Sequence, residues 1–388
     1  MTQRTIAIFT TTRAEFGLFL PLLQAINADP DLRYLLFVGG THLAVEHGYT
    51  LTEIQEQKYP VTDTFDYLLN ENTSFSLSRS MGVASIELAH LFQHYSFDAI
   101  CILGDRYELL PIVTTAILFK KPIFHINGGE KTEGVIDEQI RHMVTKASHL
   151  HFVACEEYAQ NVRRMGEPAN RIIITGALGI DNIVNLKKIP KSDLYENLGL
   201  NPDQQTVLLT YHPVTLEFEV PPEKQISNLF EALSHFKFQV VVTAPNIEVN
   251  RDKLLRLIKE NVAKNDHYHY FDSLGVLRYH SLIPHCLFVI GNSSSGILEV
   301  PFFRIPTVNI GDRQQGRLRH LSIIDTDYSV PSIMSGIHKA QDVEFRKSLT
   351  KMTFKFGNGQ AAPKIVNSIK SIDINQQFIR KVLDFPEN

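Results

Sequence analysis

Cysteine is scarce in this sequence: 388 residues contain only Cys101, Cys155 and Cys286. The three lie far apart and form no CxxC pair or other metal-ligand spacing, so we expect neither a disulfide framework nor a structural zinc site. The histidines also lack the spacing of metal ligands. We therefore expect no metal and no other cofactor, in a protein of the reducing cytoplasm.

Long apolar runs and an excess of positive charge are also missing. No stretch approaches the ~18 apolar residues of a membrane span, and the apolar run at residues 5–9 is too short for a signal-peptide core. Lys and Arg number 38 against 42 Asp and Glu, a net charge of -4. This balance argues against nucleic acid or a membrane surface as a partner, although a few local arginines can still bind a small anion.

Short apolar runs alternate with amphipathic stretches along the chain, which indicates parallel strands joined by crossover helices. The amphipathic stretches include residues 18–27, 76–94, 108–119 and 137–146. The pattern lapses at residues 179–202, where we place a domain boundary. The sequence thus predicts two doubly wound α/β domains, residues 1–180 and 203–365. The expected strands are 5–9, 34–38, 98–103, 122–126, 151–154 and 171–175 in the first half, and 207–210, 239–243, 268–271, 287–290 and 307–310 in the second.

Polar and charged side chains follow these strands in both halves. Ligands of open parallel sheets bind beyond the carboxyl ends of the strands. We therefore expect two sheets whose strand ends face a shared cleft. The residues in question are Arg13, Asp105, Arg106, Glu130, His212, Asn246 and Arg313.

Residues 291–296, Gly-Asn-Ser-Ser-Ser-Gly, lie between a strand and an expected helix at 297–303. Free N–H groups at a helix start and serine hydroxyls suit a phosphate, here from Ser293, Ser294, Ser295 and Gly296. The loop is not a Walker A motif, because no Gly-Lys-Ser/Thr follows. A serine-rich N-cap without a ligand explains it about equally well. Glu299 either accepts from a ribose hydroxyl or is a solvated helix residue.

Three carboxylates of the first half suit proton transfer to and from carbon and oxygen: Asp105, Glu130 and Asp137. Asp137 and Arg141 share a helix face. They form either a surface salt bridge or a pair in which Arg141 adjusts the pKa of a carboxylate beside a reaction centre.

Cationic and imidazole groups at strand ends complete the pattern. A surface salt bridge explains any one of Arg13, Arg106 and Arg313, but three at strand ends favour a diphosphate. His212 precedes a proline, which fixes its ring at the sheet edge.

Seven motifs in this order closely resemble the hydrolysing UDP-N-acetylglucosamine 2-epimerases of sialic-acid biosynthesis, the NeuC type. The resemblance covers nearly the whole chain, to about residue 325. It implies the GT-B fold, two Rossmann-like domains with a cleft between them, and a C-terminal helix (366–388) that crosses back to the first domain. It also implies a homodimer or homotetramer. The motifs are residues 12–17, 104–108, 125–130, 137–142, 212–213, 291–296 and 311–317.

The same resemblance implies the reaction: UDP-GlcNAc and water give N-acetylmannosamine and UDP, through elimination to 2-acetamidoglucal and hydration. Asp105, Glu130 and Asp137 would transfer the protons, and the sequence leaves open which one removes the C2 proton. The groups that would position or neutralise are Arg106, Arg141 and His212. Those that would hold UDP are Arg13, Asn246, the 293–296 loop and Arg313, with Glu299 on the ribose and the backbone at Leu274 on uracil.

Two departures leave alternatives open. The first loop reads Arg-Ala-Glu-Phe-Gly where family members often have Asp and Tyr, so its contacts beyond Arg13 stay undecided. Residues 78–82 resemble a sister group that acts on UDP-2,4-diacetamido-2,4,6-trideoxyglucose in the legionaminic-acid pathway. A GT-B glycosyltransferase and a non-catalytic UDP-sugar sensor are the other hypotheses. The three carboxylates argue against both.

Overall fold

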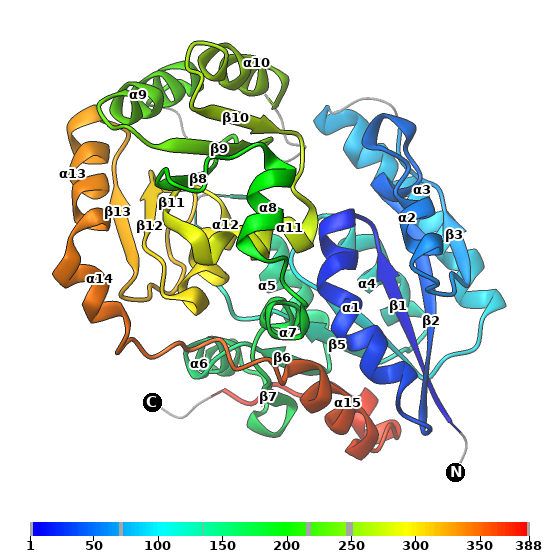
Figure 1. The fold of residues 1–388 in the computed structure, drawn as a ribbon. Helices are drawn as coiled ribbons and strands as arrows, with labels where there is room; N and C mark the ends of the chain where they lie inside the picture. Colours follow the sequence, from blue (N-terminus) through cyan, green and yellow to red (C-terminus); the bar gives the residue numbers. More distant parts are fainter. Residues whose placement is uncertain (1–2, 70–72, 134, 215–218, 246–250, 386–388) are drawn as a thin grey trace. The chain divides into compact units, whose positions relative to one another are not determined.

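The computed structural model describes residues 3–69, 73–133, 135–214, 219–245 and 251–385. It divides into two compact units (Figure 1). The first unit consists of Met1–Glu130, Asp137–Asn185 and Lys355–Asn388, and the second of Lys131–Ile136 and Leu186–Phe354.

The first unit is built on a parallel sheet whose strand order is β3-β2-β1-β4-β5-β6-β7. β1 lies centrally, with Ile8 paired to Leu36 of β2 and to Cys101 of β4. These strands are short and apolar on both faces, as a sheet covered by helices on both sides requires. Their bounds are β1 Arg4–Thr10, β2 Leu32–Gly39, β3 Asp63–Phe65, β4 Ala99–Leu103, β5 Ile123–Ile126, β6 Leu150–Val153 and β7 Ile172–Ile174.

Helices cover both faces of this sheet. Ile6 and Ile8 face a core formed with α1 and α15, whereas Ala7 and Phe9 face a core formed with α3, α4 and α5. The alternation follows from the period of two along a strand. The helices are α1 Arg13–Asn27, α2 Leu51–Glu56, α3 Ser74–His94, α4 Leu109–Leu118, α5 Asp137–Ala147, α6 Glu156–Arg164, α7 Leu178–Asn185, α15 Ala361–Ser371 and α16 Gln376–Ile379.

The second unit repeats this plan with the parallel order β10-β9-β8-β11-β12-β13. α9, α10 and α13 cover one face, and α8 and α11 the other. The strands are β8 Thr206–Thr210, β9 Gln239–Thr243, β10 Tyr268–Phe271, β11 Cys286–Gly291, β12 Thr307–Ile310 and β13 Ile323–Thr326. The helices are α8 Lys191–Leu198, α9 Pro222–Ser234, α10 Arg251–Val262, α11 Gly275–Leu282, α12 Ser294–Leu298, α13 Val330–Gln341 and α14 Val343–Leu349.

Every expected strand is present, and the doubly wound class is confirmed. The sequence missed β3 and β13, which are short edge strands with few apolar residues. The expected helix at 297–303 is wrong in detail, because α12 ends at Leu298 and a 3-10 turn, Val300–Phe303, follows. A proline at position 301 lies in that turn and cannot donate the helical hydrogen bond.

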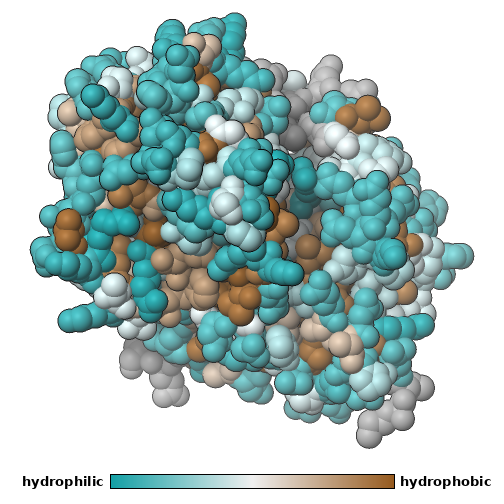
Figure 2. All heavy atoms as spheres, viewed as in Figure 1, coloured by the Kyte–Doolittle hydropathy of each residue, from teal (hydrophilic) through white to brown (hydrophobic). Residues whose placement is uncertain are grey.

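One face of the second unit can be followed in Figure 2. Figure 2 shows mostly hydrophilic side chains over α9 and α10. None of the helices in the described part of the chain is long and apolar enough to cross a membrane. The three cysteines are buried and unpaired.

The unit boundaries differ from the expected domains at two places. Lys131–Ile136 belongs to the second unit, where Glu133 N–H donates to the Gln315 carbonyl at 3.0 Å. The chain returns to the first unit already at Lys355. The reason is the start of α15: the Asp181 carboxylate of α7 accepts from the N–H groups of Ala361 (2.9 Å) and Ala362 (2.7 Å), which caps that helix.

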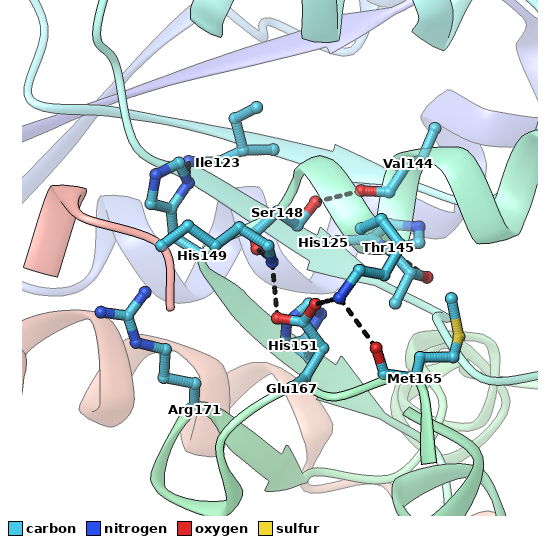
Figure 3. A network of polar contacts seen from close by, with 12 residues as sticks. Ile123, His125, Val144, Thr145, Ser148, His149, His151, Met165, Glu167 and Arg171 are labelled. Atoms are coloured by element: carbon cyan, nitrogen blue, oxygen red, sulfur yellow. Dashed lines mark hydrogen bonds and ion pairs between the residues drawn. The ribbon is translucent and has the colours of Figure 1, made fainter. Parts of the chain in front are cut away.

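A buried carboxylate anchors the last segment of the chain (Figure 3). Glu167 binds Lys146 at 2.6 Å, His151 at 3.0 Å and, from the C-terminal segment, Lys381 at 2.5 Å. Burial alone would raise the pKa of Glu167, but these hydrogen bonds lower it to about 2. His149 donates to a main-chain carbonyl of α16 at 3.1 Å. Residues after α16 are thus part of the first unit's fold.

Candidate functional site

Arg141 joins the loops that follow β4 and β5 in the first unit. Its side chain is 1% exposed and lies on α5. The guanidinium forms an ion pair with Asp105, a second one with Glu138 at 2.7 Å, and donates to the main-chain carbonyl of Glu130 at 3.1 Å. Burial opposes the charge, but the carboxylates raise the pKa of Arg141 overall. Two residues expected in the site, Asp105 and Glu130, therefore meet at a third, the buried cation Arg141.

Asp137 begins α5 beside this cluster. Burial raises its pKa to about 6, the charge of Asp105 adds to the rise, and Arg106 partly offsets it. A carboxyl group with a pKa near the working pH can both accept and donate a proton. The sequence placed Asp137 and Arg141 on one helix face, and the charge of Arg141 acts to lower the pKa of Asp137. The structure also shows ion pairs of Arg141 with Glu138 and Asp105. Glu138 was missed, although it lies three residues before Arg141.

Because the pKa of Asp137 is raised in the folded state, we expect its ionised carboxylate to lower the free energy of unfolding at neutral pH. The folded state favours the protonated carboxyl, so the cost is absent below pH 3.8, grows as the pH rises to 6 and is constant above it. Asp137→Asn should therefore raise the free energy of unfolding at pH 8, by at most about 3 kcal/mol, and by less at pH 5. Urea unfolding at the two pH values measures this. Asp193→Asn on the surface of α8 is the control, and a destabilised Asp137→Asn at pH 8 would contradict the account.

Arg106 and Glu108 form a second ion pair in the loop after β4. The Arg106 guanidinium donates to the Glu108 carboxylate at 2.8 Å, and Glu108 is 3% exposed. The negative charge of Glu108 raises the pKa of Arg106, so this arginine is a permanent cation beside Asp137.

Glu15 is a buried acid that the sequence did not single out. Its carboxylate accepts from the Thr11 N–H at 2.7 Å, while its own N–H donates to the Thr12 hydroxyl at 3.3 Å. Burial raises the pKa of Glu15 to about 7. The spacing Thr-x-x-Glu before an apolar helix is a capping-box signal, which predicts the bond from the Glu15 N–H to the Thr12 hydroxyl; the Glu15 carboxylate itself accepts from the N–H of Thr11, one residue before the N-cap.

Arg13 does not join the Arg141 cluster. It begins α1 and pairs with Glu53 of α2 at 3.0 Å, with both side chains partly exposed. The structure thus gives Arg13 the surface salt bridge that the sequence left open for each arginine.

His125 lies at 0% exposure in β5 and supports the β4 loop. Its Nε2 lies 2.8 Å from the Gly104 carbonyl, so that nitrogen carries the proton. Burial lowers the pKa of His125 to about 4, which keeps the ring neutral. His125 therefore fixes the peptide directly before Asp105.

In the second unit, His212 and Arg313 lie beside one another at the strand ends. His212 follows β8 and is 4% exposed. Burial holds its pKa well below the usual value, and the charge of Arg313 lowers it further. Arg313 donates to the carbonyls of Pro213 at 3.2 Å and Asn292 at 3.4 Å. A neutral imidazole and a fixed guanidinium are suitable donors for an anion.

Glu299 lies within a chain of hydrogen bonds. Ser295 donates to its carboxylate at 2.5 Å, His280 lies 3.3 Å away, and Tyr279 donates to the Ser295 hydroxyl at 3.0 Å. Burial would raise the pKa of Glu299, but His280 and Ser295 lower it overall, so the group is a carboxylate acceptor. His280 was missed, because no sequence motif surrounds it.

The remaining predicted residues have mixed surroundings. Ser293 and Ser294 lie at the start of α12, a helix too short for a strong dipole. Gly296 lets α12 approach β12, since a Cβ there would lie 2.9 Å from the Thr307 methyl group. Leu274 is 3% exposed and packs in the core below α11. Asn246 lies outside the described residues.

Two doubly wound parallel units in one chain are the architecture of the GT-B class of α/β enzymes. In the described part of the chain, no group of three or more His, Cys, Asp or Glu residues could hold a metal ion.

Comparison with known proteins identifies the family. The model of the UDP-N-acetylglucosamine 2-epimerase family matches residues 24–370, so the chain belongs to this family. The chain is 35% identical over 387 residues to the GDP/UDP-N,N'-diacetylbacillosamine 2-epimerase (hydrolyzing) of Campylobacter jejuni, covering 99% of this chain and 100% of that one. It is 31% identical over 388 residues to polysialic acid biosynthesis protein P7 of Escherichia coli, covering 99% and 98%.

The solved structures agree on the fold. The UDP-GlcNAc 2-epimerase of Neisseria meningitidis, bound to UDP-GlcNAc, superimposes with a TM-score of 0.83 at 16% identity, covering 95% of this chain and 100% of that one. The resemblance expected from the motifs is confirmed at the level of family and fold.

Proposed function

We propose that the protein is a hydrolysing UDP-N-acetylglucosamine 2-epimerase, which converts UDP-GlcNAc and water to N-acetylmannosamine and UDP for sialic (nonulosonic) acid and capsule polysaccharide synthesis. The observation that carries the proposal is the cluster in which buried Arg141 holds Asp105 and the Glu130 backbone beside Asp137, with its pKa of about 6. Relatives named as hydrolysing 2-epimerases and as a polysialic acid protein support it.

The first half of the reaction breaks the bond between C1 and the diphosphate oxygen. Negative charge develops on the leaving UDP, and preorganised donors lower the barrier to its departure. Arg313, His212 and the serines at 293 and 294 are the donors of the second unit, with Glu299 accepting from the ribose hydroxyls. Arg13 is the candidate that the first unit adds.

The second half is proton chemistry on the sugar. A carboxylate removes the C2 proton as the C1–O bond breaks, which gives 2-acetamidoglucal with a C1–C2 double bond. Water then adds its oxygen to C1, and an acid delivers a proton to C2 from the face opposite to the one from which the first proton was removed. Asp105, Glu130 and Asp137 supply these steps. The sum is hydrolysis of the bond between C1 and UDP, with inversion at C2 and no change of redox state, so no redox cofactor is needed.

Location and assembly complete the proposal. Three buried, unpaired cysteines fit the cytoplasm. A homodimer or homotetramer is supported by exposed apolar side chains on α3, α4 and α5, among them Ile86 (60%), Leu118 (80%) and Met143 (58%). Sedimentation equilibrium measures the assembly state.

The test of the activity is incubation with UDP-GlcNAc alone. We expect the reaction to release UDP and N-acetylmannosamine in equal amounts, as measured by NMR. A glycosyltransferase would release UDP only with an acceptor, and a sensor would bind UDP without turnover. Either result would refute the proposal.

A second substrate is favoured by one observation: the Campylobacter relative, which is named for N,N'-diacetylbacillosamine, is more similar than the polysialic acid protein, 35% against 31%. The same chemistry on UDP-2,4-diacetamido-2,4,6-trideoxyglucose is therefore the alternative. Competition between the two UDP-sugars in one reaction decides it, since the ratio of kcat/KM values equals the ratio of initial product rates at equal concentrations.

A further inference from the structure

Asn292 clamps the main chain of His212. It follows β11 directly and is 0% exposed. Its Oδ1 accepts from the His212 N–H at 2.7 Å, and its Nδ2 donates to the His212 carbonyl at 2.9 Å. An amide side chain offers one acceptor and donors together, so it satisfies both main-chain groups of one residue. Pro213 favours the extended backbone at His212, in which these two groups point to the same side.

The main chain of Asn292 reaches a third loop. Its carbonyl accepts from the Gln314 amide at 3.1 Å and from the Arg313 guanidinium at 3.4 Å. Arg313 also donates to the carbonyl of Pro213 at 3.2 Å. Since β8, β11 and β12 are neighbours in the sheet, Asn292 ties together the loops that follow three adjacent strands.

Gly291 makes the clamp possible. Its φ is +132°, and a Cβ at this position would lie 2.0 Å from the carbonyl oxygen of Thr210 at the end of β8. Only glycine permits so close an approach of the two strands. The approach brings the next side chain, that of Asn292, within hydrogen-bond reach of His212.

We infer that Asn292 is a positioning residue for phosphate recognition: it fixes the His212 main chain and the Arg313 guanidinium, so that both side chains are ordered as donors to the diphosphate of a UDP-sugar. The inference rests on the proposed function, because it takes UDP as the ligand of these strand ends. Donors that are already ordered bind an anion without a further loss of conformational entropy. If this order is lost, the affinity for the anion falls, whereas the affinity for the rest of the ligand does not change.

The test compares two ligands that differ only in the diphosphate. Asn292→Ala should weaken UDP binding about tenfold or more and leave uridine binding within about twofold, because the nucleoside does not use the fixed donors. Calorimetry measures UDP, and ligand-observed NMR titration measures the weaker uridine. The affinity ratio of UDP to uridine is the readout, since a general loss of structure would lower both.

Gln239→Ala is the matched control. Gln239 is also 0% exposed and clamps one residue in the same way: its Oε1 accepts from the Asn201 N–H at 2.9 Å and its Nε2 donates to the Asn201 carbonyl at 2.8 Å. It lies at the start of β9, at the end of the strands opposite to that of Asn292. Both variants should lose stability in thermal unfolding, but only Asn292→Ala should change the ratio.

An unchanged UDP-to-uridine ratio in Asn292→Ala, or an equal change in Gln239→Ala, would overturn the inference while the proposed function stands. Failure of the wild-type protein to bind UDP would overturn both. Asn292→Ser keeps one hydroxyl for the clamp and serves if the alanine variant does not fold. It should show an intermediate loss of UDP affinity with uridine unchanged, and a wild-type ratio there would contradict the inference equally.

Discussion

Glu130→Gln is expected to lower kcat about 10²–10⁴-fold while UDP binding stays within about twofold. Glu130 ends the first-unit segment after β5, is 5% exposed, and its carbonyl is held by Arg141. The amide has nearly the same shape as the carboxylate but neither accepts nor releases a proton at neutral pH. The proton transfers at C2 should therefore fail, whereas the UDP donors of the second unit are untouched.

Glu133→Gln is the control for this variant. Glu133 lies three residues further along the chain, in the piece that belongs to the second unit, and its side chain is exposed. We expect its kcat within about twofold of the wild-type value. Steady-state kinetics with UDP release as the signal, together with calorimetry of UDP, gives both quantities. Full activity of Glu130→Gln would remove this residue from the chemistry.

Arg141→Leu is expected to abolish activity and to lower the free energy of unfolding by about 3–5 kcal/mol. The reason is that the buried guanidinium neutralises Asp105 and Glu138 together, and leucine would leave both carboxylates without it. Arg141→Lys keeps the charge but not the planar fork that serves three acceptors, so it should recover part of the stability and little activity.

Urea unfolding and kinetics of the two Arg141 variants measure these effects. Arg256→Leu, which removes an exposed Arg256–Glu260 pair at 3.8 Å, is the control and should change stability by at most about 1 kcal/mol. An Arg141→Leu protein as stable as the control would show that Arg141 is not the neutralising centre of the cluster.

The sequence predicts the fold well because its main signal is local. Short apolar runs between amphipathic stretches mark buried parallel strands, and this periodicity is present in all the central strands. It fails for Asp63–Phe65 and Ile323–Thr326, which are edge strands paired on one side only. Edge strands need fewer apolar residues, so they give a weaker pattern.

The site is only partly predictable for the same reason. That Asp105, Glu130 and Arg141 meet follows from the rule that strand ends share one edge of a sheet. The ion pair of Glu138 with Arg141 depends on how α5 is rotated about its axis, which sequence spacing leaves open. The contact of Asn292 with His212 spans 80 residues and depends on the approach of two strands at Gly291.

The central claim is that the enzyme eliminates UDP and then hydrates the glycal. The most direct measurement is turnover of UDP-GlcNAc in deuterated water without any acceptor, with the product examined by NMR and mass spectrometry. The account predicts UDP and N-acetylmannosamine with one deuterium at C2, because the proton removed there exchanges with solvent before an acid returns one. N-Acetylmannosamine that carries only protium at C2, or an N-acetylglucosamine product, would contradict it.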